Sequence, residues 1–161
     1  MIDSFDKEFA FLSNFYPSKI SSGEKVGREL IIYPTVEHAF QAGKTLDLQL
    51  RKKIANQPTP GKAKRLGRSL KLRPDWDEAE RFVRMQDCIR AKFEDPVLRR
   101  LLLNTGDQEL IEGNFWHDNF WGDCHCEKCK SIKGQNNLGK MLMEERELIR
   151  RESKEDLLIF L

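Results

Sequence analysis

Signals for the start of a helix recur along the whole chain and constrain its fold more than any other feature. A capping side chain, a proline in the first turn, or both precede a helix-compatible stretch at several positions. These positions are Thr35, Thr59-Pro60, Asp75, Asp95-Pro96 and Asn137. The segments between them that favour strands are short. The pattern predicts an α+β protein, mainly helical, with a small β-sheet in a single domain.

The longest predicted helix follows Asp75. Asp75 is expected to cap it, with a glutamate three residues on, as in a capping box. Apolar side chains then recur at helical spacing and predict one buried stripe. They are Phe82, Met85, Ile89 and Phe93. Short extended segments are expected at residues 9–12, 30–33 and 109–112.

The chain of 161 residues has the length of one domain and can bury an ordinary core. We expect residues 1–150 to form that domain and residues 151–161 to form a tail packed on it. The longest apolar run is residues 157–161, far short of the ~20 residues that span a membrane. The N-terminal segment lacks the basic start and apolar stretch of a secretory signal. Four cysteines in such a chain favour a reducing cytoplasm as the location.

Basic residues are concentrated in one part of the sequence. Residues 51–73 contain nine lysines and arginines and no aspartate or glutamate. Such asymmetry suits a phosphate-bearing partner or a nucleic acid. A solvated helical face followed by a loop is the alternative interpretation.

The helix expected after Thr35 carries a group of polar residues on one face. Glu37, Gln41 and Lys44 are spaced i, i+4 and i+7, so they lie on the same side of a helix. A carboxylate, an amide and an amine could converge there on a polar ligand. Glu37 lies in the first turn, where the helix dipole favours the ionised carboxylate. An exposed face with a weak Glu–Lys ion pair is the alternative.

Residues 114–123 combine aromatic side chains with Asp and Asn. Trp116 and Trp121 lie in this segment together with two phenylalanines and Asp118. Such a mixture suits stacking and hydrogen bonding of a flat base or a sugar. A loop whose aromatic residues plug the core is the alternative. Asn136, before the last helix, could hold an anion or a ribose, although a simple turn explains it equally well.

The cysteines Cys124, Cys126 and Cys129 form a C-x-C-x-x-C run. Three thiolates could bind zinc if His117, His125 or Cys88 supplied a fourth ligand. A second CxxC pair is missing, so reduced thiols in an ordinary loop are the favoured interpretation. No P-loop, GxGxxG or GxSxG motif is present, and no cofactor is expected.

Several motifs together resemble the NADAR (YbiA-like) family over nearly the whole chain. They include LSNF at 12–15, PTVEHAFQA at 34–42 with Lys44, GR at 67–68, LRPDW at 72–76, LLNTG at 102–106, WG at 121–122 and QNNLG at 135–139. The segment 124–129 lies in a region of variable length in that family. The resemblance implies a YbiA-like fold and a hydrolase that cleaves an N-glycosidic bond.

The resemblance implies two substrate classes: ADP-ribosylated guanine in nucleic acid and the phosphoribosylamino-pyrimidine intermediates of riboflavin synthesis. The basic stretch suits a pyrophosphate or DNA somewhat better than a single phosphate. Cleavage builds positive charge on the ribose, which a carboxylate stabilises. By resemblance, Glu37 and Asp118 are the expected carboxylates. His38 is expected to be structural, because it follows Glu37 directly and so points in another direction from the helix. The expected substrate-binding residues are Asn14, Gln41, Lys44, Arg68, Arg73, Trp76, Lys92, Trp116, Trp121 and Asn136.

Two other classes of function compete with the enzyme. One is a non-catalytic module that binds ADP-ribose or a nucleotide. The other is a nucleic-acid-binding protein that uses a zinc site and the basic stretch, whose binding to DNA would depend steeply on salt. A membrane partner is not expected.

Overall fold

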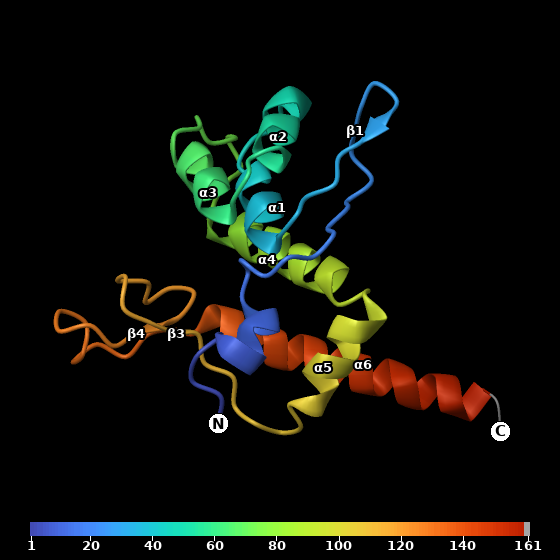
Figure 1. Ribbon diagram of the computed structural model, residues 1–161, viewed down its shortest axis with the longest axis vertical. Coiled ribbons are helices and arrows are strands. Elements are labelled where there is room, and N and C mark those ends of the chain that lie inside the picture. Colours follow the sequence, from blue (N-terminus) through green and yellow to red (C-terminus); the bar gives the residue numbers. More distant parts are fainter. Residues whose placement is uncertain (160–161) are drawn as a thin grey trace. The chain divides into compact units, whose positions relative to one another are not determined.

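The computed structural model describes residues 1–159 (Figure 1). Its contacts divide the chain into two compact units. The central unit comprises Asn14–Asp95, and the terminal unit comprises Met1–Ser13 together with the chain from Pro96 onward. The predicted packing of the tail depends on side chains 155–161, which lie outside those that the structure describes.

Helix α1 (Val36–Ala42) is the centre of the central unit, and all seven of its residues are buried. It contacts α2 (Leu48–Ala55), α3 (Pro60–Arg68) and α4 (Glu78–Lys92). A short antiparallel hairpin, β1 (Lys25–Val26) and β2 (Glu29–Leu30), precedes α1. The predicted strand at residues 30–33 is therefore reduced to the end of β2 and a single bridge between Tyr33 and Ile20.

The helix starts confirm two of the predicted caps in this unit. The Thr35 hydroxyl accepts the His38 N–H at 3.2 Å, and the Thr59 hydroxyl accepts the Lys62 N–H at 3.2 Å. The prediction for Asp75 is wrong: α4 is capped by Asp77, which accepts the Glu80 N–H at 2.8 Å. The Asp75 carboxylate instead accepts hydrogen bonds from the neighbouring Arg73 guanidinium.

The predicted apolar stripe of α4 is borne out. Met85, Ile89 and Phe93 are buried, and Phe82 is half-buried. The stripe faces the interior because residues three and four apart share one side of a helix.

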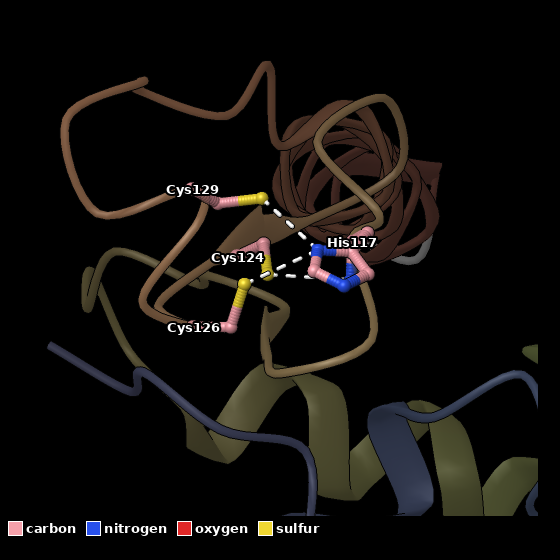
Figure 2. Close-up of side chains that lie close together, drawn as sticks. All are labelled: His117, Cys124, Cys126 and Cys129. Carbon is pink, nitrogen blue, oxygen red and sulfur yellow. Dashed lines mark hydrogen bonds between the residues drawn. The ribbon is translucent and has the colours of Figure 1, made fainter.

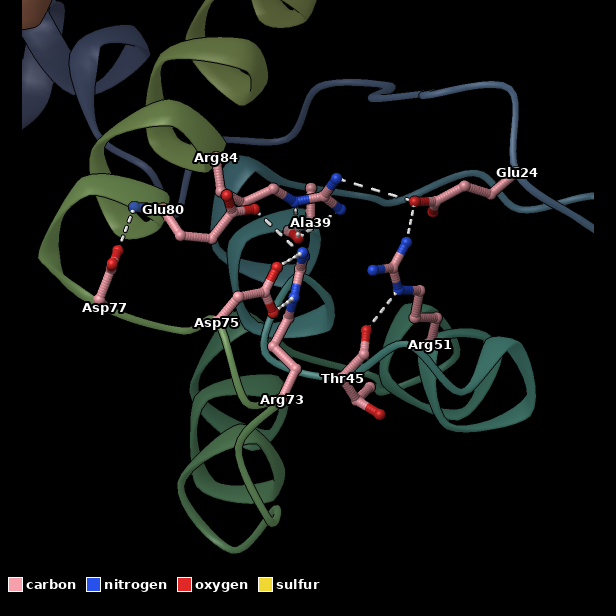
Figure 3. Close-up of polar contacts among 9 residues, drawn as sticks. All are labelled: Glu24, Ala39, Thr45, Arg51, Arg73, Asp75, Asp77, Glu80 and Arg84. Carbon is pink, nitrogen blue, oxygen red and sulfur yellow. Dashed lines mark hydrogen bonds and ion pairs between the residues drawn. The ribbon is translucent and has the colours of Figure 1, made fainter.

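Polar contacts tie the hairpin side of the central unit to its helices (Figure 3). The Glu24 carboxylate pairs with Arg51 of α2 and lies 3.7 Å from Arg84 of α4. It also accepts the Tyr33 hydroxyl at 2.6 Å. The Arg84 guanidinium donates twice to the Ala39 carbonyl of α1, at 3.1 and 2.9 Å. Burial of Tyr33 and its bond to Glu24 raise the pKa of that phenol.

The terminal unit is built on α5 (Pro96–Asn104) and the long helix α6 (Asn137–Ile159). Residues 9–12, predicted to be extended, belong instead to a 3-10 helix, η1 (Lys7–Leu12). Its consecutive residues Phe11 and Leu12 are both buried, an arrangement that a strand, with its alternating faces, disfavours. The predicted strand at 109–112 is a single bridge between Leu110 and Ile2.

The other regular structure of the terminal unit is a parallel pair, β3 (Gly113–Asn114) and β4 (Asp123–Cys124). Asn137, predicted as a cap, is the first residue of α6, and its side chain donates to the Phe120 carbonyl at 2.8 Å. The α+β class, mainly helical with little sheet, is confirmed. Among the described helices, none combines the length and the hydropathy that a membrane crossing requires.

Candidate functional site

Helix α1 carries a carboxylate and an amide into the interior of the central unit. Glu37 is 6% exposed and Gln41 is 3% exposed. The Gln41 amide nitrogen donates to the Glu37 carboxylate at 2.7 Å, and the Glu37 N–H donates to the Asn14 carbonyl at 3.0 Å. Their spacing places both on one face, as predicted. The alternative of an exposed face is wrong, because α1 is surrounded by other helices.

The Gln41 carbonyl lies against a glycine of α3. A Cβ atom at Gly67 would come within 2.1 Å of Gln41 Oε1, so α3 approaches α1 here only because position 67 has no side chain. The same Oε1 atom is buried and accepts no hydrogen bond from the residues that the structure describes. Buried acceptors are nearly always paired in folded proteins. This oxygen is therefore a candidate acceptor for a ligand.

Lys44 extends the polar group at the end of α1. It is half-buried, and burial lowers the pKa of its ammonium group. The Glu37 carboxylate counteracts this effect and raises the pKa, whereas Arg68, Arg81 and Lys64 lower it further. The Glu37 carboxylate and three further cations are therefore close enough to Lys44 to influence its ammonium group. An anionic group placed among these cations would relieve their repulsion.

Lys64 and Arg81 were not among the residues predicted for the site. Lys64 and Arg68 are four residues apart on α3, so their shared face was a signal available in the sequence. Arg81 comes from α4, and only the tertiary fold places it near Lys44. His38, expected to be structural, is buried and contacts the Thr35 hydroxyl at 2.8 Å and the Gln57 carbonyl at 3.0 Å.

The other predicted site residues of the central unit differ in how far contacts within the protein already occupy their side chains. The Arg73 guanidinium is paired with Asp75 and Glu80, so its charge is already balanced within the protein. The half-buried Trp76 packs on Phe40, with ring centroids 5.6 Å apart. Lys92 is 1% exposed, and burial lowers its pKa to about 7.

Lys92 also lies over the ring of Tyr16, 5.8 Å from its centroid. Asn14 is buried, and its amide nitrogen lies 3.5 Å from the Met85 sulfur.

The acid-free basic stretch folds into α2, α3 and the segment that follows. Arg51, Lys52 and Arg73 form ion pairs with carboxylates. Lys64 lies 5.9 Å from the centre of the Phe15 ring. The remaining cations are exposed, and within the described part of the chain none forms an ion pair. They are Lys53, Lys62, Arg65, Arg68 and Lys71.

The terminal unit holds the other predicted residues. The Asp118 carboxylate accepts the backbone N–H groups of Phe120 and Trp121, at 3.1 and 2.8 Å, so one of its oxygens shapes the loop. Trp121 is half-buried, with its ring edge-on to Phe120. Trp116 is 62% exposed and free to stack on a flat group.

The Asn136 side chain is bound to backbone on both sides. It accepts from Glu112 N–H at 3.0 Å and donates to the Leu110 carbonyl at 2.9 Å. Its polar atoms therefore hold the start of α6 in place.

The cysteine run also lies in the terminal unit, and the structure adds a histidine to it. His117, Cys124, Cys126 and Cys129 offer one ligand atom each, and these atoms lie within 4.8 Å of one another (Figure 2). His125 and Cys88, the other candidates for a fourth ligand, are not part of this cluster.

Comparison with known proteins identifies the class of protein and then the family. The N-glycosidase YbiA of Escherichia coli K12 is 42% identical over 118 residues, covering 71% of this chain and 69% of that protein. A riboflavin biosynthesis protein of Vibrio vulnificus is 34% identical over 160 residues, which are 97% of this chain and 40% of that protein. The predicted enzyme class, an N-glycosidase, is thereby confirmed.

The NMR structure of E. coli YbiA has the same fold. It superposes with a TM-score of 0.75 at 36% identity and covers 96% of this chain and 90% of that one. The model of the NADAR domain matches residues 3–150. The chain belongs to the NADAR domain family.

Proposed function

We propose that the protein hydrolyses the C–N bond of a phosphorylated N-riboside, with Glu37 as the carboxylate that stabilises the transition state. One observation carries this proposal: Glu37 is buried on the central helix and bonded to Gln41, in the region where Lys44 and its neighbouring cations gather. Burial of a charged carboxylate raises the free energy of the folded state, and such buried charges are typical of functional sites.

The chemistry follows from the bond that breaks. As the C–N bond lengthens, its electron pair moves to the nitrogen and the ribose carbon becomes positively charged. The ionised Glu37 lowers the energy of that charge. Water then forms a bond to the carbon, and the departing nitrogen takes up a proton. Lys44 and Arg68 bind the phosphate, and Gln41 positions the Glu37 carboxylate through its amide hydrogen bond.

In the terminal unit, considered by itself, Asp118 is the proposed carboxylate and Trp116 is the proposed stacking residue. Among the described residues, both backbone N–H groups that bind Asp118 donate to the same carboxylate oxygen, Oδ1. Trp116 is exposed. Arg73 and Asn136 are not proposed to bind substrate, because their polar atoms are engaged within the protein.

The favoured substrate is a phosphoribosylamino-pyrimidine. The name of the Vibrio relative supports it, and a single phosphate matches the small cationic group around Lys44. ADP-ribosylated guanine in DNA, favoured from the sequence alone, is the second candidate. The exposed cations of α2 and α3 without carboxylate partners support it, since DNA requires a broader basic surface.

The test is product analysis by mass spectrometry on both substrates with matched variants. Glu37→Gln keeps the shape and the bond to Gln41 but removes the charge, and it should lower turnover by about 100-fold or more. Glu94→Gln is the control, because Glu94 is exposed and follows α4. Both variants should bind substrate and melt like the wild type.

The outcomes separate the competing functions. Release of ribose 5-phosphate supports the first substrate, and release of ADP-ribose supports the second. Undiminished turnover by Glu37→Gln would overturn the role of Glu37. Tight binding of either compound without any product would indicate the non-catalytic module.

A further inference from the structure

We propose that His117, Cys124, Cys126 and Cys129 bind a zinc ion that fixes the loop between β3 and the start of α6. This inference rests on the terminal unit alone and does not depend on the proposed reaction. The sequence by itself favoured reduced thiols, because a second CxxC pair is missing and the choice of a fourth ligand among His117, His125 and Cys88 stayed open. The tertiary structure supplies that ligand.

Two nitrogen–sulfur distances are close to those of a tetrahedral zinc site. Zinc binds thiolates at about 2.3 Å and imidazoles at about 2.0–2.1 Å, which places two sulfurs about 3.8 Å apart and a nitrogen and a sulfur about 3.6 Å apart. His117 Nδ1 lies 3.2 Å from Cys126 Sγ and 3.4 Å from Cys129 Sγ. All four ligand atoms fall within 4.8 Å of one another, and Figure 2 shows the four side chains close together.

The backbone conformation brings the four ligand side chains together. The parallel pairing of Asn114 with Cys124 forces the intervening loop to return, which places His117 beside the thiols. His117 adopts a left-handed backbone conformation with φ of 66°, an unusual one for a residue other than glycine. Its N–H also donates to Cys124 Sγ at 3.3 Å. Such N–H to sulfur bonds stabilise a thiolate.

The surrounding segment is crossed by hydrogen bonds to Asp118 and Asn119, but few of its apolar side chains are buried. Its strands are two residues long, and three of its large apolar side chains, Phe115, Trp116 and Ile132, are 71%, 62% and 58% exposed. Two of the side chains buried here are instead the thiols of Cys124 and Cys129. A segment with few buried apolar side chains is commonly stabilised by a metal or a disulfide. Three thiols with one imidazole match a metal better than a disulfide, which would leave one thiol over.

The four protein ligands leave no open position on the metal, so the ion is structural and not catalytic. The ion acts on function by positioning the side chains beside His117. His117 lies between Trp116 and Asp118 in the sequence, so binding the histidine fixes the backbone from which both side chains project. Three lysines and one glutamate follow Cys126 up to residue 133, and their charge suits the net negative charge of a three-thiolate site.

The first test is the metal content of the full chain purified in reducing buffer without chelator, together with a cobalt titration. We expect about one zinc per chain, and a cobalt spectrum with the intense d–d bands of a tetrahedral thiolate site. Chain that holds no zinc and gives no such cobalt spectrum would overturn the proposal. A disulfide between two of the three thiols in freshly purified protein would also overturn it.

Matched variants assign the ligands. His117→Ala should lose the zinc, whereas His125→Ala, which changes an exposed histidine of the same loop outside the cluster, should keep it. Cys126→Ser is the preferred cysteine variant, because Cys126 is the least buried of the three thiols. Full zinc occupancy in both His117→Ala and Cys126→Ser would refute this ligand set. The wild-type measurement decides the proposal even if a variant fails to fold.

Discussion

Replacement of Gly67 by alanine tests how closely α3 must approach α1 for the buried carboxylate to be held. The added Cβ atom would lie 2.1 Å from Gln41 Oε1 and 2.8 Å from its Cβ and Cδ atoms. Nonbonded carbon atoms prefer separations of about 3.5–4.0 Å. Gln41 is 3% exposed and bonded to Glu37, so its side chain has little space into which it can move.

The expected loss of stability follows from a comparison within the same helix. Gly61→Ala is the control, because a Cβ atom there meets only the Thr59 hydroxyl oxygen at 4.0 Å. Both variants gain about 0.5–1 kcal/mol of helix propensity, so the difference between them reports the overpacking alone, about 1–3 kcal/mol. At about 2–4 °C per kcal/mol, Gly67→Ala should melt about 2–12 °C below Gly61→Ala.

Thermal unfolding followed by circular dichroism measures this difference. Equal melting temperatures for the two variants would refute the close contact between Gly67 and Gln41. Under the proposed function, Gly67→Ala should also lower turnover, because displacement of Gln41 disturbs its bond to Glu37. Gly61→Ala should turn over substrate like the wild type.

Three further predictions follow from other contacts. Thr35→Ala should cost about 1–2 kcal/mol in urea unfolding, more than Thr59→Ala, because the buried Thr35 hydroxyl contacts both the N–H and the ring of His38. Lys92 has a native pKa near 7 against 10.5 unfolded, so the unfolded chain binds the extra proton between these values. Stability should therefore rise with pH across that interval, and the rise should be absent in Lys92→Met. Asp118→Asn keeps an oxygen that can accept the two backbone N–H groups, so it should melt like the wild type, whereas Asp118→Ala should melt lower. A loss of turnover in Asp118→Asn at unchanged stability would assign a catalytic charge to Asp118, and full turnover would limit it to the loop.

Local chemistry made several elements predictable. Thr35 and Thr59 cap their helices because the bond from a capping hydroxyl reaches only three residues along the chain. The stripe of α4 was equally local, since helical spacing alone defines its face. Asp75 failed as a cap because Arg73 competes for its carboxylate, a choice between partners that helix-start rules do not include.

The candidate site shows the same division. The spacing of Glu37 and Gln41 determined that they share a face of α1, and the C-x-C-x-x-C run determined that three thiols lie close together. Burial of Glu37 was decided by the three helices that contact α1, because the exposure of a helix face depends on what packs against it. The arrival of Arg81 near Lys44, and of His117 beside the thiols, depended on α4 and on the pairing of β3 with β4. Spacing along one element is set by backbone geometry, whereas neighbours from distant segments meet only when the chain folds.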